Sequence, residues 1–269
     1  MEPMLTIALN AARKAAAIIE HSLERVDLVR IETKGRNDFV SEVDRKAEAE
    51  ILYHLKKAYP DHSFIGEEGG VSGNSKSDYA WIIDPLDGTT NFLHGIPHFA
   101  VSIACTYKGQ LQHAVVLDPI KREEFTASRG KGATLNERRI RVTDRRNLDG
   151  ALIGTGIPFN GFALEHVDEY LNCLKDVASQ TAGVRRAGSA ALDLAYVAAG
   201  RFDGFWESHL QSWDIAAGMV LVREAGGMTT EMNGGDPLKT GSIIAGNPDL
   251  HPQLEKCLRQ AGARTPNVD

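Results

Sequence analysis

The sequence predicts a layered α/β fold in which helices cover the faces of sheets. Two patterns carry this prediction. Residues 64–125 contain short apolar or β-branched runs between turn residues, and residues after 147 alternate between strand-like and helix-like segments. The chain has 269 residues, 42% hydrophobic and 25% charged, which suits one large domain or two closely packed halves. We expect halves of residues 1–146 and 147–269 within one compact unit.

Two helices are expected near the N-terminus. Pro3 precedes an apolar pattern that continues to Ile19 and predicts an amphipathic helix. A second helix is predicted to begin at Ser41, a good N-cap, and to end before Pro60. Asp44 falls at its N3 position, where a carboxylate completes a capping box. The buried stripe of this helix is predicted to comprise Ile51, Leu52 and Leu55.

The remaining elements are predicted from short apolar runs and from the glycines that end them. In the first half we expect strands at residues 81–83, 100–106, 114–117 and 133–135, the last after a turn at 128–132. In the second half we expect strands at 151–154, 202–206 and 243–245. Helices are predicted at 164–178, at 189–199 before Gly200, at 214–225, and at the end of the chain up to Leu258.

Charge and cysteine content exclude several classes of protein. The formal net charge of −6 gives no general attraction to nucleic acid or to an anionic membrane. Cys105, Cys173 and Cys257 lie far apart without a C-x-x-C pair, which favours free thiols in a reducing compartment. No run approaches the roughly 18 apolar residues of a membrane-spanning helix, and the N-terminus lacks a signal-peptide pattern. We therefore expect a soluble cytoplasmic protein without membrane contact.

One short segment departs from the acidic average. It contains Arg138, Arg139, Arg141, Arg145 and Arg146. A solvated strand and turn would explain these charges. A subunit contact or an RNA-binding patch would explain them too, and charge spacing alone does not separate the three interpretations.

The segment WIIDPLDGTTNF carries the clearest chemical pattern. A buried strand runs directly into Asp84 and Asp87, with Pro85 expected to end the strand and Gly88 to permit a tight turn. A short helix is expected to begin at Thr90 or the next residue. This arrangement gathers two carboxylates, which are ligands suited to Mg²⁺, and free backbone N–H groups, which bind anions. The alternative is that both aspartates only cap a turn.

Two more acidic positions strengthen the interpretation as a metal site. Glu67 and Glu68 follow an apolar pair and lie between glycines, so a strand again delivers carboxylates to a turn. Asp214 follows Trp213 at the start of a predicted helix. Considered by itself, each position has a simpler explanation. The glutamates would be solvated loop charges, and Asp214 would be an N-cap.

Three segments together resemble the inositol monophosphatase family, and its bacterial SuhB-type members look nearest. The segments are Gly66-Glu67-Glu68, DPLDGTTNF at 84–92 and WDIAAG at 213–218. The likeness covers almost the whole chain, including the spacing between these highly specific blocks. It implies a layered αβαβα sandwich of the sugar-phosphatase type, shared with fructose bisphosphatase. It also implies a homodimer that hydrolyses inositol monophosphate with Mg²⁺ and is inhibited by lithium.

The resemblance assigns roles to individual positions. Residues 1–146 would carry most metal ligands, and residues 147–269 would complete the substrate pocket. Thr89, paired with Asp44, would orient and help deprotonate the attacking water, and Glu67 would also serve catalysis. Lys34 matches a basic residue over the metal site, although a solvated loop lysine is an equally simple interpretation. The implied metal ligands are Glu67, Asp84, the backbone carbonyl of Leu86, Asp87 and Asp214.

The substrate pocket is expected to extend into the second half of the chain. Gly188 and Ser189 open a helix, so their backbone N–H groups can meet substrate oxygens. Glu207 matches a family residue that hydrogen-bonds substrate hydroxyls, and Arg185 could reach either the substrate or a neighbouring subunit. The implied substrate-binding residues are Leu86, Asp87, Gly88, Thr89, Arg185, Gly188, Ser189, Ala190, Glu207 and Asp214.

Other motifs in the sequence do not predict a further functional site. Gly154-Thr155-Gly156 begins like a dinucleotide-binding loop, but Pro158 interrupts it. His94 and His98 are separated by Pro97, which breaks the helix that would align them as zinc ligands, so both are predicted to be structural. The pattern G-x-x-x-x-G-K-[ST] is absent, which argues against an ordinary kinase or NTPase.

Two alternatives to the inositol phosphatase stay open. The catalytic motif is shared with phosphatases of fructose bisphosphate and 3′-phosphonucleotides, although Glu207 and the short chain favour the inositol branch. Some bacterial relatives are associated with antitermination or RNA-processing complexes. A binding partner of RNA polymerase or ribosomal RNA, with secondary phosphatase activity, is therefore the second hypothesis.

Overall fold

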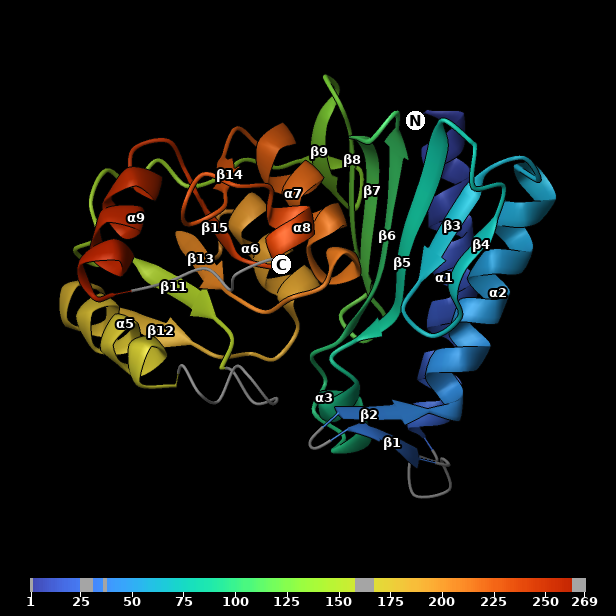
Figure 1. Cartoon of the computed structure of the whole chain (residues 1–269), viewed down its shortest axis with the longest axis horizontal. Helices are drawn as coiled ribbons and strands as arrows, with labels where there is room; N and C mark the ends of the chain where they lie inside the picture. Colours follow the sequence, from blue (N-terminus) through green and yellow to red (C-terminus); the bar gives the residue numbers. More distant parts are fainter. Residues whose placement is uncertain (1, 25–30, 36–37, 158–166, 263–269) are drawn as a thin grey trace.

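Figure 1 shows helices and sheets stacked in five layers in the computed structural model, which describes residues 2–24, 31–35, 38–157 and 167–262. For residues 31–41 only the backbone is described. From one side to the other, the layers are α1 (Pro3–Leu23) with α2 (Glu42–Ala58), a large sheet, a central helical layer, a small sheet, and a second outer pair of helices. The predicted αβαβα sandwich is confirmed.

The large sheet is built from the first half of the chain, in the order β10-β9-β8-β7-β6-β5-β3-β4. All neighbouring strands are antiparallel except β3 and β5. The strands are β3 (Ser63–Gly66), β4 (Gly70–Gly73), β5 (Tyr79–Asp87), β6 (Ala100–Tyr107), β7 (Gln110–Asp118), β8 (Glu123–Ser128), β9 (Gly132–Leu135) and β10 (Arg138–Arg139).

The small sheet comes from the second half, in the order β12-β11-β13-β15-β14. Its outer face is covered by α5 (Val167–Gln180) and α9 (His251–Gln260). The central layer between the sheets comprises α6 (Ala190–Ala198) and α7 (Ser212–Glu224), with the short α8 (Pro237–Thr240) beside it. The strands are β11 (Leu152–Thr155), β12 (Gly183–Arg185), β13 (Gly204–Glu207), β14 (Met228–Thr230) and β15 (Ile243–Gly246).

Two small elements lie at one end of the large sheet in Figure 1. The hairpin of β1 (Ile31–Gly35) and β2 (Asp38–Ser41) precedes α2, and α3 (Thr89–Leu93) follows β5. Gly88, with φ of +97°, forms the N-cap of α3, so the tight turn predicted there is confirmed.

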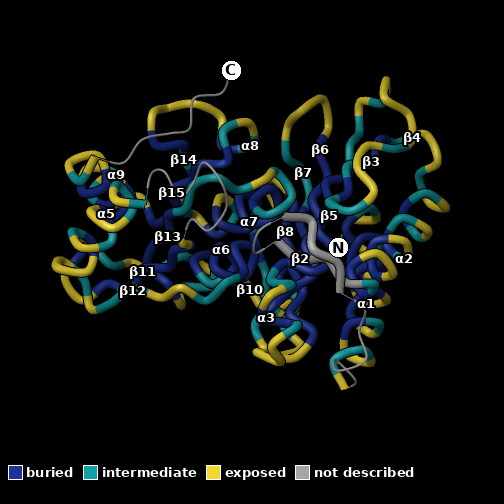
Figure 2. Tube along the Cα trace, turned by 60° about the horizontal axis from the view of Figure 1, so that its bottom comes forward, coloured by how far each residue is buried: buried dark blue, intermediate teal, exposed yellow. Residues whose placement is uncertain are grey.

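The central helices are apolar on nearly every side because a sheet covers each of their two broad faces. Figure 2 shows exposed residues collected on hairpin turns and on the outer helices. The close approach of α6 and α7 depends on Gly218, because a Cβ there would lie 2.5 Å from the Cβ of Leu194. This packing fixes the N-terminal turns of both helices relative to each other.

The structure corrects two local predictions. β5 does not end at Pro85 but continues to Asp87, with a shift of register between Asp84 and Asp87. The proline is tolerated because it lies in this irregular stretch, where the ladder to β6 is interrupted, and beyond the point where β3 ends. α7 begins at Ser212, so Asp214 is the third helical residue and not the N-cap.

The other predicted helices and strands agree closely with the observed ranges. The helix expected at 164–178 is α5, and residues 164–166 lie outside the described part. The elements without a separate prediction are β1, β2, β4, β8, β12, β14 and α8. Glycines dominate β4 and glutamates open β8, which conceals both from an apolar pattern. The division at residues 146 and 147 stays a prediction. None of the helices in the described ranges is both long enough and apolar enough to span a membrane.

Candidate active site

Three aspartates from distant parts of the chain meet where β5 ends and α7 begins. Ligand oxygens of Asp84, Asp87 and Asp214 all lie within 4.8 Å of one another. The irregular end of β5 separates the first two, and the first turn of α7 supplies the third. Asp84 and Asp87 are buried. The acidic cluster predicted from the sequence therefore exists as one site.

Each aspartate is fixed through one of its carboxylate oxygens. The backbone N–H of Leu86 donates to Oδ1 of Asp84 at 2.9 Å. Oδ2 of Asp87 accepts from Ser189 Oγ at 2.6 Å and from the backbone N–H of Ala191 at 2.7 Å. Oδ2 of Asp214 accepts from the backbone N–H of Gln211 at 2.7 Å. These bonds set the direction of the carboxylates before any ligand binds.

Crowding of buried carboxylates makes the site electrostatically unfavourable without a cation. Burial, followed by the charges of Glu67, Asp87 and Asp214, raises the pKa of Asp84 well above its ordinary range. The pKa of Asp214 is raised by burial and then by Asp87, and that of Asp87 is raised by burial. Hard oxygen donors under mutual repulsion are what a small divalent cation requires. The residues present therefore fit a magnesium site.

Glu67 follows β3, and its turn is held by a residue that sequence reasoning missed. The carboxylate of Glu48, on α2, accepts from the backbone N–H groups of Glu68 at 2.9 Å and Gly69 at 2.7 Å. A Cβ at Gly66 would lie 2.4 Å from Oε2 of Glu48, so any larger residue there would displace this carboxylate. The available signal was a glutamate one helical turn after Asp44, on the same face as buried Ile51.

Thr89 and Asp44 form the predicted pair. Thr89 Oγ1 lies 2.9 Å from Oδ1 of Asp44 and 3.1 Å from the carbonyl oxygen of Leu86. Asp44 is fully buried on the first turn of α2. A hydroxyl has one proton to donate, and donation to Asp44 leaves its lone pairs directed elsewhere as acceptors.

The N-terminus of α6 forms the opposite wall of a cleft of about 170 Å³. Ser189 caps α6, and its Oγ accepts from the backbone N–H of Leu192. Gly188, with φ of +94°, is held near α3 by Asn91, whose side-chain amide donates to the carbonyl oxygens of Ala187 at 2.9 Å and His98 at 2.8 Å. Asn91 is a second positioning residue that sequence reasoning did not assign.

Most predicted residues line this cleft or lie directly beneath it. The lining residues are Glu67, Asp87, Gly88, Thr89, Thr90, Thr155, Gly156, Arg186, Gly188, Ser189, Ala190, Asp193, Glu207, Leu210 and Asp214. Asp44, Asp84 and Leu86 are buried. Lys34 lies on β1, and its side chain is outside the described part of the chain.

Arg185 is the predicted residue that the structure does not place at the cleft. Its side chain is exposed at the end of β12, where Nη1 donates to the carbonyl oxygen of Val184 at 3.1 Å. The adjacent Arg186 lines the cleft, because successive residues at a strand end project to opposite sides. Sequence reasoning named Arg185 alone and missed Arg186.

Glu207 closes the inner end of the cleft. A Cβ at Gly156 would overlap the Glu207 carboxylate, so this glycine provides the space in which the side chain lies. Burial, with the charges of Asp193 and Asp87, raises the pKa of Glu207 to about 8. A protonated carboxyl can donate a hydrogen bond to a ligand oxygen, and an ionised one can accept from a hydroxyl.

Known proteins resemble this chain over most of its length. The profile of the inositol monophosphatase family covers residues 1–263. A protein of Pseudomonas aeruginosa named Nus factor SuhB is 58% identical over 250 residues, 92% of both chains. The crystal structure of the suppressor protein SuhB from Bartonella henselae has a TM-score of 0.93 and 46% identity, covering 97% of this chain and 100% of its own. An inositol monophosphatase from Anabaena has a TM-score of 0.82 and 37% identity, covering 95% of both chains.

Proposed function

The chain belongs to the inositol monophosphatase family, and on this premise we propose that it hydrolyses inositol monophosphate to inositol and phosphate with Mg²⁺. Membership supports phosphatase activity, while the substrate and the metal are our proposal. The observation that carries it is the convergence of Asp84, Asp87 and Asp214 beside the Thr89–Asp44 pair. A substrate phosphate would lie in the cleft between these residues and the N-terminus of α6.

The proposed metal ligands are Glu67, Asp84, the carbonyl oxygen of Leu86, Asp87 and Asp214. Bound magnesium would supply Lewis-acid stabilisation of the phosphoryl group, an acidified water and a stabilised leaving oxygen. The chain contributes the positions of these oxygens, and those of Asp84, Asp87 and Asp214 are set by the backbone N–H or hydroxyl donors described above. It also contributes burial, which strengthens every electrostatic interaction in the cleft.

Thr89 and Asp44 would handle the proton of the attacking water. If the Thr89 hydroxyl donates to Oδ1 of Asp44, its oxygen can accept a hydrogen bond from that water. As the water attacks phosphorus, the bond from phosphorus to the inositol oxygen would break, a proton of the water would pass to Thr89 and the threonine proton to Asp44. The released inositol oxygen would take a proton from solvent water. General base assistance of this kind contributes typically 10²–10⁴-fold to a rate.

The other wall would orient the substrate. Backbone N–H groups at Gly188, Ser189 and Ala190 would meet its oxygens, and Glu207 would hydrogen-bond a ring hydroxyl. Arg186 lines the same cleft and replaces Arg185 in our assignment of the phosphate-facing guanidinium. These contacts favour a compact polyhydroxylated phosphate ester over a long one.

The decisive measurement is phosphate release from inositol 1-phosphate with and without Mg²⁺, and with lithium added. We expect release that requires Mg²⁺ and falls with lithium. Fructose bisphosphate and a 3′-phosphonucleotide serve as competing substrates, and a higher kcat/KM for either would replace inositol phosphate in the proposal. Mass measurement during chromatography tests the proposed homodimer.

A second function rests on the names of the relatives. The Pseudomonas relative is a Nus factor, so we propose that this chain also takes part in transcription antitermination, as a partner of RNA polymerase or ribosomal RNA. Arg138, Arg139 and Arg141 offer an exposed or half-exposed basic edge for such a partner. Arg145, by contrast, pairs with Asp203 at 3.2 Å. Full rescue of a deletion strain by a hydrolysis-deficient Asp87→Asn chain would make this the principal function.

A further inference from the structure

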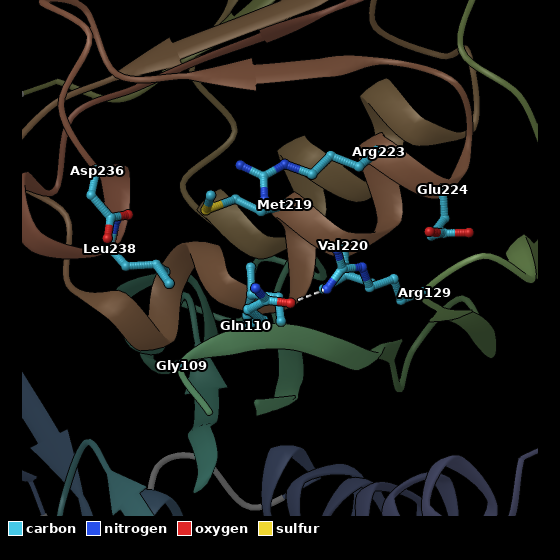
Figure 3. Close-up of a pocket in the computed structure, with 10 residues that line it drawn as sticks. Gly109, Gln110, Arg129, Met219, Val220, Arg223, Glu224, Asp236 and Leu238 are labelled. Carbon is cyan, nitrogen blue, oxygen red and sulfur yellow. Dashed lines mark hydrogen bonds between the residues drawn. The ribbon is translucent and has the colours of Figure 1, made fainter. Parts of the chain in front are cut away.

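A second cleft lies at the other end of α7, away from the aspartate cluster. Figure 3 shows it between the β6–β7 turn, the end of β8, the last turns of α7 and the start of α8. Its volume is about 400 Å³, which is the size of a small-molecule site. Its lining residues are Gly109, Gln110, Leu111, Arg129, Met219, Val220, Arg223, Glu224, Asp236 and Leu238.

Two guanidinium groups line this cleft, and neither forms an ion pair with the two carboxylates that also line it. Arg129 donates to the side-chain oxygen of Gln110, and Nε of Arg223 donates to Thr229 Oγ1 at 2.7 Å. Neither arginine forms an ion pair with a carboxylate in the parts of the chain that are described. Each guanidinium has five N–H donors, so most donors of the pair remain for a ligand.

The two carboxylates that line the cleft have other partners. Glu224 accepts from the backbone N–H groups of Gly130 at 2.8 Å and Gly132 at 2.7 Å, which fixes the β8–β9 turn. Asp236 caps α8 by accepting from the backbone N–H of Leu238 at 3.1 Å. Both carboxylates therefore act on backbone donors, and the guanidinium groups keep their hydrogen-bonding capacity.

Burial disfavours the charged form of Arg223. It lowers the pKa of Arg223, the charge of Asp236 raises this pKa, and the smaller effect of Arg129 lowers it. A group whose charged form is disfavoured by burial and by a like charge is stabilised by a bound anion. The floor between the charges is apolar, with Leu111, Met219 and Leu238.

We propose that this cleft is a second binding site, for a small molecule that carries a phosphate or carboxylate group on a compact apolar body. Arg129 and Arg223 would bind the anionic group through charge-assisted hydrogen bonds, and the amide of Gln110 would add a donor. The apolar floor would contact the body of the ligand. The site is separate from the proposed catalytic cleft: Asp214 and Arg223 are nine residues apart on α7, or roughly 14 Å along its axis.

The test is calorimetric titration of the full chain with phosphate, pyrophosphate and citrate in the presence of EDTA. Without metal, the aspartate cluster repels anions, so binding reports on the second cleft. We expect binding by the unmodified chain, and Arg129→Gln and Arg223→Gln should each weaken it roughly tenfold or more. The relative affinities for pyrophosphate and citrate show whether phosphate or carboxylate is preferred.

Arg122→Gln is the matched control, because it removes the same charge from an exposed position outside the cleft. It should bind as the unmodified chain does. Equal affinity in all four proteins, or no binding by the unmodified chain at millimolar anion, would overturn the proposal. Arg129 lies on an exposed turn, so its variant remains informative if Arg223→Gln fails to fold. None of these outcomes depends on whether the chain hydrolyses inositol phosphate.

Discussion

The two ends of α7 carry opposite charges in different surroundings. Asp214 lies in the first turn and Arg223 in the last, so both have the sign that the helix dipole favours. Around Asp214 the neighbours are Asp84 and Asp87, all three with raised pKa values. Around Arg223 the nearest cation is another arginine, across an apolar floor.

The comparison shows that charged side chains gathered in one cleft identify a binding site better than any single residue. The dipole alone would account for either Asp214 or Arg223 as a stabilising end charge worth 0.3–1 kcal/mol. It does not account for two further aspartates within 4.8 Å or for a second guanidinium. Neighbours of the same sign raise the free energy of the unliganded protein, and a ligand of the opposite sign lowers it.

The largest effect is expected from Asp87→Asn. This change removes one carboxylate from the acidic end and leaves acceptors for Ser189 Oγ and the Ala191 N–H. We expect kcat/KM for inositol 1-phosphate to fall by about 10³-fold or more, while thermal unfolding stays cooperative. Near-normal hydrolysis in Mg²⁺ would show that the aspartate cluster is not the metal site, and the comparison between the two ends would fail.

A smaller effect is expected from Glu48→Gln. This change weakens the hydrogen bonds that hold the turn beside Glu67 and leaves the proposed metal ligands intact. The Glu48 carboxylate accepts from two backbone N–H groups beside Glu67, and an amide can present only one acceptor oxygen. We expect Mg²⁺ to be needed at roughly 10-fold higher concentration for half-maximal activity. The control is Glu50→Gln, on the same helix, where the carboxylate pairs with His54 in a half-buried position. Equal magnesium dependence of both variants would contradict the assignment.

A third prediction compares the adjacent residues Arg185 and Arg186. Both arginines are exposed, but Arg186 lines the cleft and opposes the charges of Asp193 and Glu207, whereas Arg185 does not line it. We expect Arg186→Gln to raise KM for inositol 1-phosphate roughly tenfold and Arg185→Gln to change it less than about twofold. Steady-state kinetics of the two variants measure this directly. A larger effect at Arg185 would return the substrate contact to the residue first predicted from sequence.

Much of the acidic end could be predicted from the sequence, and little of the basic end. DPLDGTTNF is contiguous, so Asp84, Asp87 and Thr89 are recognisable together, and its glycine indicates a tight backbone turn. Glu48 and Asn91 act through side-chain bonds to backbone groups distant in sequence, which local patterns do not reveal. Arg129 and Arg223 come together only through the packing of α7 on the large sheet.

The smallest expected effect concerns stability rather than turnover, and it tests whether negative charge accumulates in the cleft itself. Glu207 has a pKa of about 8 against an ordinary value of 4.5. The folded, metal-free protein therefore keeps a proton that the unfolded chain has lost, so the free energy of unfolding falls as pH rises from about 4.5 to about 8. Glu207→Gln should remove this slope, and its melting temperature in EDTA should exceed that of the unmodified chain by a few degrees near pH 8 but not near pH 5. Glu50→Gln again serves as the control and should follow the unmodified chain at both pH values. A parallel shift of Glu207→Gln at all pH values would mean that the carboxyl group is ionised in the folded protein, and that the excess negative charge is confined to the three aspartates.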